Sequence, residues 1–291
     1  MNPRDPVRPR PALAAAAAYL RCPVCAGPLC LDGSQLACGH GHSFDIARHG
    51  YVNLTAGRAG PGTADTSAMV TARDRFLGRG HYHHLAAAVR SSAAQHDPGA
   101  PGLVVDLAGG TGYYLADILD ALPRRHGLCI DLSVPALRRA ARAHPRAAAL
   151  GADVWRRLPL ADRSAALVLS IFGPRNAAET SRILIPGGTL IIAVPGAGHL
   201  RELRRPLGLI GIDQRKRQRL ADAYRDYAPS GVTAVNYQLS LDHADLTALV
   251  SMGPSARHIT PQALSAGLRY LPSPATVTVD LKIIFLEQSP K

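Results

Sequence analysis

Long apolar segments are missing from this sequence of 291 residues. The longest apolar runs, residues 165–172 and 189–197, fall far short of the roughly 20 residues that a membrane helix needs, which excludes a helical membrane-spanning protein. Lysine and aromatic residues are also scarce: three of the 33 basic residues are lysines, and aromatic residues make up 5% of the chain. Hydrophobic residues nevertheless make up 47%, so the chain can bury a large core.

Arginine supplies the other basic residues, and the 21 acidic residues leave a net charge of +12. Because Arg contacts phosphate groups in a bidentate manner, this excess favours a polyanionic partner such as a nucleic acid. A coding bias toward Ala and Arg is the alternative explanation. The basic run 215–219, with Arg201, Arg204 and Arg205 before it, is predicted to be a phosphate-contacting helix face, and a merely solvated helix is the alternative.

Cysteine occurs five times, an odd number that does not fit a disulfide framework and indicates a reducing compartment, the cytoplasm. The spacing Cys22-x2-Cys25-x12-Cys38-x3-His42 supplies four ligands of the kind that zinc prefers. His40 competes with His42 for the fourth position. All four positions are filled by protein atoms, so the predicted zinc is structural, and a redox role for Cys-x2-Cys lacks a thioredoxin-like context.

The chain divides by composition into three parts. Residues 1–18 are rich in Pro, Arg and Ala and are predicted to be a flexible lead-in. Residues 19–66 form a predicted zinc-binding, RNA-recognition domain followed by a loop, and residues 67–291 form the larger domain. A single helix is expected over residues 67–92. From Leu103 onward short apolar strands alternate with helices, which predicts an α/β fold with a doubly wound parallel sheet.

A nucleotide-binding pattern follows the first of these strands. Asp106 and the glycine loop with Gly110 and Gly112 stand where a strand ends and a helix begins, so the backbone can approach a ligand closely. Asp131 ends the next strand, where an acid can bind ribose hydroxyls, and Asp153 comes where a carboxylate can contact adenine. With the turn 186–188, this order is similar to the class I (Rossmann-like) S-adenosylmethionine methyltransferase fold. Ala108 departs from it, because that family usually has its first glycine there.

The whole chain from about residue 19 to 286 resembles a narrower family, the RlmA-type 23S rRNA (guanine-N1)-methyltransferases, and within it the actinobacterial macrolide-resistance branch. The matching stretches include residues 21–25, 42–54, 64–70, 80–82, 138–147, 152–155, 174–176 and 252–255. The resemblance implies a structural zinc on Cys22, Cys25, Cys38 and His42. It also implies S-adenosylmethionine contacts from Tyr82, Gly110, Thr111 and His199.

The implied substrate is one guanine, 745 or 748, in a domain II hairpin loop of 23S rRNA. Likeness to the resistance branch favours 748, where methylation would weaken macrolides of the tylosin or mycinamicin type, and the family suggests a homodimer. Guanine N1 must lose its proton, so a base is expected. Asp65 and Asp153 are candidate bases, Asn53 and Asn176 are candidate orienting residues, and Phe172 is a candidate stacking face. Each of them could equally serve as a helix cap, a turn residue or part of the core.

Two alternative functions follow from the same residues. One is a methyltransferase that acts on a small molecule, against which the zinc motif and the basic balance argue. The other is a non-enzymatic rRNA-binding factor with a vestigial cofactor fold. The intact set Asp106, Gly110, Gly112, Asp131 and Asp153 argues against this second alternative.

Overall fold

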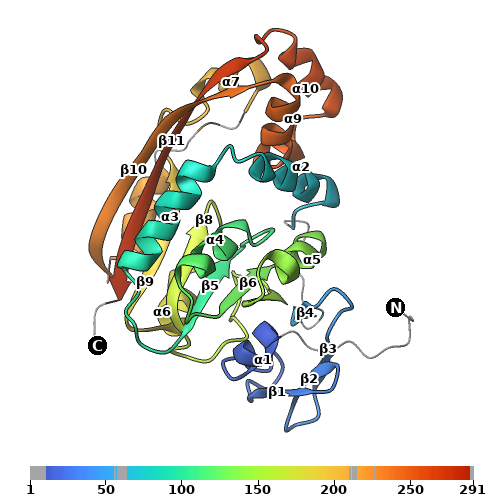
Figure 1. The fold of residues 1–291 in the computed structure, drawn as a ribbon, viewed down its shortest axis with the longest axis vertical. Coiled ribbons are helices and arrows are strands. Elements are labelled where there is room, and N and C mark those ends of the chain that lie inside the picture. Colours follow the sequence, from blue (N-terminus) through green and yellow to red (C-terminus); the bar gives the residue numbers. More distant parts are fainter. Residues whose placement is uncertain are drawn as a thin grey trace.

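The computed structural model describes residues 11–55, 57, 64–209, 211, 215–225 and 227–288. A mixed sheet of eight strands forms its centre, in the order β10-β11-β9-β8-β5-β6-β7-β4 (Figure 1). The strands are β4 (Val52–Asn53), β5 (Leu103–Leu107), β6 (Gly127–Asp131), β7 (Ala147–Gly151), β8 (Ala165–Ile171), β9 (Leu184–Pro195), β10 (Tyr227–Leu241) and β11 (Ala275–Gln288). Neighbours from β4 to β9 pair in parallel, whereas β11 is antiparallel to both β9 and β10.

Helices cover both faces of this sheet, which explains why β5, β7 and β8 are buried at every position. The helices are α1 (Pro11–Ala17), α2 (Ser67–Gly78), α3 (His83–Gln95), α4 (Tyr113–Ala121), α5 (Val134–Ala143), α6 (Ala177–Ile183), α7 (Arg201–Leu207), α8 (Arg215–Ala223), α9 (His243–Ser251), the 3₁₀ helix η1 (Pro254–Arg257) and α10 (Pro261–Leu268). Apolar residues of α3, α4 and α5 pack on one face, and those of α1 and α6 pack on the other. No described helix is both long and apolar enough to cross a lipid bilayer.

The prediction of a flexible lead-in over residues 1–18 is wrong for residues 11–17, which form α1. Leu13 and Ala16 are fully buried, and α1 packs against β6 and β7. The connection between β7 and β8 forms no helix, so α1 covers the sheet face that would otherwise be bare. Its small Ala side chains permit a close approach to the strands. Residues 1–10 of the predicted lead-in lie outside the described residues.

The helix expected over residues 67–92 is interrupted between α2 and α3. Gly80 has a φ of +76° there, a left-handed conformation that glycine adopts readily. The break turns the chain so that Tyr82 begins α3 as its N-cap residue. A long hairpin of β10 and β11 forms one edge of the sheet, and α9, η1 and α10 lie between its strands in sequence (Figure 1).

A small antiparallel sheet makes up the N-terminal module, from β1 (Leu29–Asp32), β2 (Gln35–Cys38) and β3 (Ser43–Asp45). The chain then continues into β4, which pairs in parallel with β7 of the large sheet. Apolar residues of the module, including Leu29 and Leu36, belong to the same buried cluster as Leu128 and Leu150 of the large sheet. The domain boundary predicted at residue 66 therefore divides a continuous sheet and a continuous core.

The basic segment after β9 forms α7 and α8. Two of its arginines are engaged within the protein: Arg204 donates hydrogen bonds to the carbonyls of Ala197 and His199, and Arg201 pairs with Glu202. Arg205 is exposed. The side chains of residues 215–217 lie outside the described part of the chain, so the predicted phosphate-contacting face stays a prediction.

Candidate active site and metal centre

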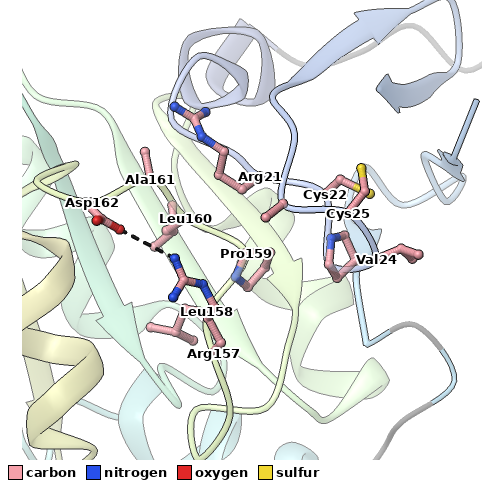
Figure 2. A pocket seen from close by; sticks show the side chains of 12 residues that line it. Arg21, Cys22, Val24, Cys25, Arg157, Leu158, Pro159, Leu160, Ala161 and Asp162 are labelled. Atoms are coloured by element: carbon pink, nitrogen blue, oxygen red, sulfur yellow. Dashed lines mark ion pairs between the residues drawn. The ribbon is translucent and has the colours of Figure 1, made fainter. Parts of the chain in front are cut away.

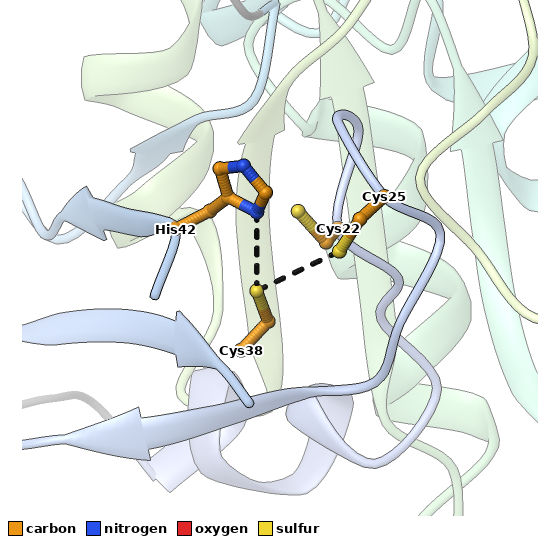
Figure 3. A group of neighbouring side chains, drawn as sticks. All are labelled: Cys22, Cys25, Cys38 and His42. Atoms are coloured by element: carbon orange, nitrogen blue, oxygen red, sulfur yellow. Dashed lines mark hydrogen bonds between the residues drawn. The ribbon is translucent and has the colours of Figure 1, made fainter. Parts of the chain in front are cut away.

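Three cysteines and one histidine of the N-terminal module converge on a single point (Figure 3). The ligand atoms of Cys22, Cys25, Cys38 and His42 all lie within 4.8 Å of one another. The Cys25 and Cys38 sulfurs are 3.7 Å apart, and His42 Nδ1 is 3.4 Å from the Cys38 sulfur. A knuckle between α1 and β1 supplies the first pair of ligands, and the end of β2 with the following turn supplies the second. The cluster contains the three predicted cysteines and, of the two candidate histidines, His42.

This cluster fits a tetrahedral zinc ion with sulfur and nitrogen ligands. Partial burial works against ionisation of the Cys38 thiol, but hydrogen bonds involving His40 and His42 outweigh it and lower the pKa of Cys38 to about 6. Cys38 is therefore largely a thiolate at neutral pH, which is the form that binds a metal. His40 is exposed, and its Nδ1 lies 3.5 Å from the Cys25 sulfur, so it sits beside the cluster rather than completing it.

An open groove of about 720 Å³ separates the cysteine knuckle from the loop that precedes β8 (Figure 2). The knuckle side carries Arg21 and Val24, and the opposite side carries Arg157 and Asp162, whose charged groups are 3.7 Å apart. None of the lining residues belongs to the glycine loop or its neighbouring acids. The groove is thus a feature of the boundary between the N-terminal module and the large sheet, separate from the predicted cofactor site.

The glycine loop lies at the carboxyl end of β5 and leads into α4. Ala108, Gly110 and Gly112 all have positive φ values, of 54°, 59° and 77°. Ala108 stands where the sequence analysis expects a glycine, and it adopts the left-handed conformation despite its side chain. A Cβ atom on Gly109 would lie 2.5 Å from Asp106 Oδ2, so only glycine fits there. Thr111 and Gly112 are buried at the start of α4.

Three acids stand at the carboxyl ends of adjacent parallel strands: Asp106 on β5, Asp131 on β6 and Asp153 after β7. Asp131 accepts hydrogen bonds from the backbone N–H groups of Gly110, at 2.9 Å, and Ser133, at 2.7 Å. Asp153 accepts one from the N–H of Trp155 at 3.0 Å. The carboxyl edge of an open parallel sheet is where such folds bind nucleotides, and the structure brings all three acids to it.

Asp106 is the most deeply buried of the three acids, at 1% exposure. Burial and the nearby charge of Asp131 raise the pKa of Asp106 to about 8. Its Oδ2 atom is buried and has no hydrogen-bond partner within the described residues. This neutral carboxyl group has an unpartnered oxygen that can accept a hydrogen bond, and it lies beside glycine backbone that a ligand can approach closely. The ammonium group of S-adenosylmethionine is a donor of that kind. The residues present therefore fit this cofactor.

Three aromatic rings line the next part of the same edge. Phe172 follows β8 and is 43% exposed, and its ring centre lies 6.2 Å from that of Tyr82 and 6.4 Å from that of His199. Gly173 connects this row to the glycine loop, because a Cβ atom there would lie 2.9 Å from the carbonyl oxygen of Leu107. Burial lowers the pKa of His199 to about 4, so its ring is neutral at physiological pH. The Phe172 ring thus lies near both Tyr82 and His199.

An arginine that the sequence analysis missed lies above the glycine loop. A Cβ atom on Gly110 would come within 2.9 Å of the Arg73 guanidinium, which extends from α2. The same guanidinium is 2.5 Å from Asp65 and donates to the carbonyl of Met252 at 2.9 Å. Ser133 donates to the carbonyl of Asp65, which fixes that loop beside the end of β6. No local motif marks Arg73, because its position depends on how α2 packs.

The remaining predicted residues lie at the same edge but make local contacts. Asn53 accepts from the N–H of Thr55 and approaches Gly151, at the end of β7. Asn176 caps α6 by accepting from the N–H of Glu179, and it donates to the carbonyl of Val154 at 3.2 Å. Both ends of the Asn176 amide are thereby occupied, so this residue positions the segment that follows Asp153.

Comparison with known proteins agrees with this geometry. A family model described as the RlmA N-terminal zinc ribbon matches residues 20–56. The crystal structure of a Bacillus halodurans protein described as a methyltransferase covers 69% of this chain and 99% of its own, with a TM-score of 0.50 and 13% identity. That likeness concerns the fold alone. Together with the three acids and the glycine loop, it defines the class: an S-adenosylmethionine-dependent methyltransferase of the Rossmann-like type with an N-terminal zinc ribbon.

Two relatives define the family within this class. The Streptomyces fradiae 23S rRNA (guanine(748)-N1)-methyltransferase is 45% identical over 268 residues, which cover 90% of this chain and 94% of the relative. A Micromonospora griseorubida protein, whose name also carries 23S rRNA (guanine-N1)-methyltransferase, is 45% identical over 91% of this chain and 96% of its own. The chain belongs to the RlmA-type family of 23S rRNA (guanine-N1)-methyltransferases.

Proposed function

We propose that this enzyme transfers a methyl group from S-adenosylmethionine to N1 of guanine 748 in the domain II hairpin loop of 23S rRNA. The observation that carries the proposal is 45% identity along nearly the whole chain to a relative named for that nucleotide. The zinc ribbon and the net charge of +12 support an RNA substrate. The enzyme would act in the cytoplasm, as a homodimer, and its methyl mark would weaken binding of tylosin-type macrolides.

The three acids and the glycine loop would hold the nucleoside part of the cofactor. Asp131 would bind the ribose hydroxyls and Asp153 the adenine edge, as the carboxyl ends of β6 and β7 allow. The backbone of Gly110 and Thr111 would lie close to the cofactor. Tyr82 and His199 would lie beside the methionine part of S-adenosylmethionine. When bound, S-adenosylmethionine supplies a methyl group activated by a positively charged sulfur. The protein's part is therefore mainly to position the two reactants.

The target guanine would enter beside Phe172, whose exposed ring offers a stacking face at the cofactor edge. Guanine N1 carries a proton at neutral pH, so a carboxylate must accept it during the transfer. Asp65 is the candidate base that lies over the glycine loop, where Arg73 pairs with it and Ser133 holds its backbone. Asp153 lies after β7, at the position proposed to contact adenine, and pairs with Arg156. Asn53, on β4, would orient the target guanine.

The experiment measures methyl transfer to a domain II transcript, with primer extension to map the modified nucleotide. We expect a stop at guanine 748 that disappears when this nucleotide is replaced by adenine and when Asp131 is replaced by Ala. Loss of the signal only after replacement of guanine 745 would assign the other nucleotide of the family. Transfer to a small acceptor without transfer to RNA would overturn the proposal. An Asp65→Asn variant that binds cofactor and keeps full turnover would exclude Asp65 as the base.

A further inference from the structure

Four basic side chains from two distant segments meet on the surface between the zinc ribbon and α5. Arg48 and His49 lie in the turn between β3 and β4, and Arg138 and Arg142 lie on α5. Arg142 reaches His49 across 93 residues of sequence, with its guanidinium 2.6 Å from His49 Nδ1. We call Arg48, His49, Arg138 and Arg142 the basic cluster.

The geometry of the basic cluster leaves it short of hydrogen-bond acceptors. Arg48 Nε lies 3.3 Å from His49 Nε2, while Arg142 contacts the other ring nitrogen. An Arg side chain has only donors, and a neutral imidazole has one acceptor and one donor. In either tautomer of the neutral ring, one of the two arginines therefore faces the ring N–H, and two hydrogen-bond donors point at each other. Partial burial and the charges of Arg142, Arg48 and Arg138 also lower the pKa of His49, which keeps the ring neutral.

Among the residues that the structure describes, no carboxylate compensates for these charges. Arg48, Arg138 and Arg142 are exposed, and none of them forms an ion pair with an acid within the described residues. The neighbouring Arg139 differs, because it pairs with Asp74 at 2.8 Å. Like charges held at such short range repel one another unless an anion lies between them. The cluster thus lacks a negatively charged group that accepts several hydrogen bonds.

The backbone around the basic cluster is held in place, and α5 connects the cluster to the cofactor edge. The turn is closed by a hydrogen bond from the Gly50 N–H to the carbonyl of Ala47, and β4 fixes it to β7. At its other end, α5 starts beside Asp131, since Ser133 N–H donates to that carboxylate. The helix spans about 15 Å from there to Ala143. Figure 1 shows α5 near β4, with the zinc ribbon strands β1, β2 and β3 on the other side of β4.

We propose that the basic cluster is a phosphate-binding site that grips the backbone of the RNA substrate a few nucleotides from the target base. The inference rests on the proposed function, because it takes rRNA as the polyanion. One phosphate would accept hydrogen bonds from Arg48 and Arg142 together, and Arg138 would contact the same or the adjacent phosphate. The site joins the zinc ribbon to α5, so RNA binding would engage both parts of the chain at once.

The test compares Arg142→Gln and Arg48→Gln/Arg142→Gln with Arg269→Gln, an exposed arginine at the end of α10 that removes one charge elsewhere. RNA affinity is measured by fluorescence anisotropy with a domain II hairpin over a range of salt concentrations. Each lost phosphate contact should reduce the slope of log K against log[salt] by about 0.7 to 0.9. We expect this reduction for Arg48→Gln/Arg142→Gln, which leaves the shared phosphate without either arginine, a smaller one for Arg142→Gln, and the smallest for Arg269→Gln. Equal slopes for the double variant and Arg269→Gln would overturn the inference.

A His49→Asp variant separates phosphate binding from a structural role. The new carboxylate would supply the missing acceptor, so we expect a higher melting temperature together with weaker RNA binding, whereas His49→Asn should alter both much less. Weaker RNA binding with a lower melting temperature would show that the cluster only supports the fold. Cofactor affinity, measured by calorimetry, should not change in any variant. If wild-type enzyme binds cofactor but neither binds nor methylates the RNA, the proposed function fails, independently of these variants.

Discussion

Asp106 provides a quantitative test of how burial shapes the cofactor site. The pKa of Asp106 is about 8 in the folded protein, against an ordinary value of 3.8, so this acid stays protonated on folding at pH 7 and ionises in the unfolded chain. The folded state therefore binds more protons between these two pKa values, and the stability contribution of Asp106 falls as the pH rises through that window. Each pH unit inside it costs about 1.4 kcal/mol.

The perturbation is Asp106→Asn, which keeps the shape of the side chain and removes its titration. Raising the pH from 5 to 7 should cost the wild type about 3 kcal/mol more than the variant in free energy of unfolding. Other titrating groups largely cancel in this difference, because they are present in both proteins. Urea unfolding at the two pH values measures it. If the wild type and the variant differ in stability by the same amount at pH 5 and pH 7, the reasoning about a neutral buried Asp106 is wrong.

Three further predictions concern the metal centre, α1 and the aromatic row. Cys38→Ser should abolish the bound zinc and unfold the N-terminal module, since metal binding supplies its folding energy, whereas the exposed Cys30→Ser should retain one zinc per chain by elemental analysis. Leu13→Ala should destabilise the protein by about 2 to 5 kcal/mol in urea unfolding, because Leu13 is fully buried between α1 and the sheet; an effect near zero would mean that α1 does not dock in solution. Phe172→Ala should lower methyl transfer to the domain II transcript about three- to tenfold, because the target guanine loses its stacking face, and Tyr270→Ala, at a residue 86% exposed, should leave the transfer unchanged.

Local patterns were sufficient for much of the site. The zinc ligands follow from Cys22-x2-Cys25, because a two-residue spacing places both sulfurs on one short knuckle whatever surrounds it. The acids Asp106 and Asp131 end buried strands, and parallel strands bring their carboxyl ends to one edge, so their proximity follows from the alternation of strands and helices. The choice of His42 over His40 did not follow from spacing and needed the folded turn after β2.

Long-range packing decided the rest. The apolar residues of α1 are mostly Ala, which give little periodic signal. The helix docks on β6 and β7 because the chain forms no helix between β7 and β8 that would cover this face. Arg73 lies over Gly110 because α2 packs there, and no motif around residue 73 announces that contact.

The sequence by itself determined the class of protein, the three cysteine ligands of the metal and the strand-end acids of this chain, since each depends on residues close together or on the order of strands. Only the tertiary structure decided that β4 extends the large sheet, that Phe172 links Tyr82 to His199, and that Arg142 meets His49. These contacts join segments far apart in the chain, and their geometry depends on how helices pack on the sheet, which no local spacing encodes.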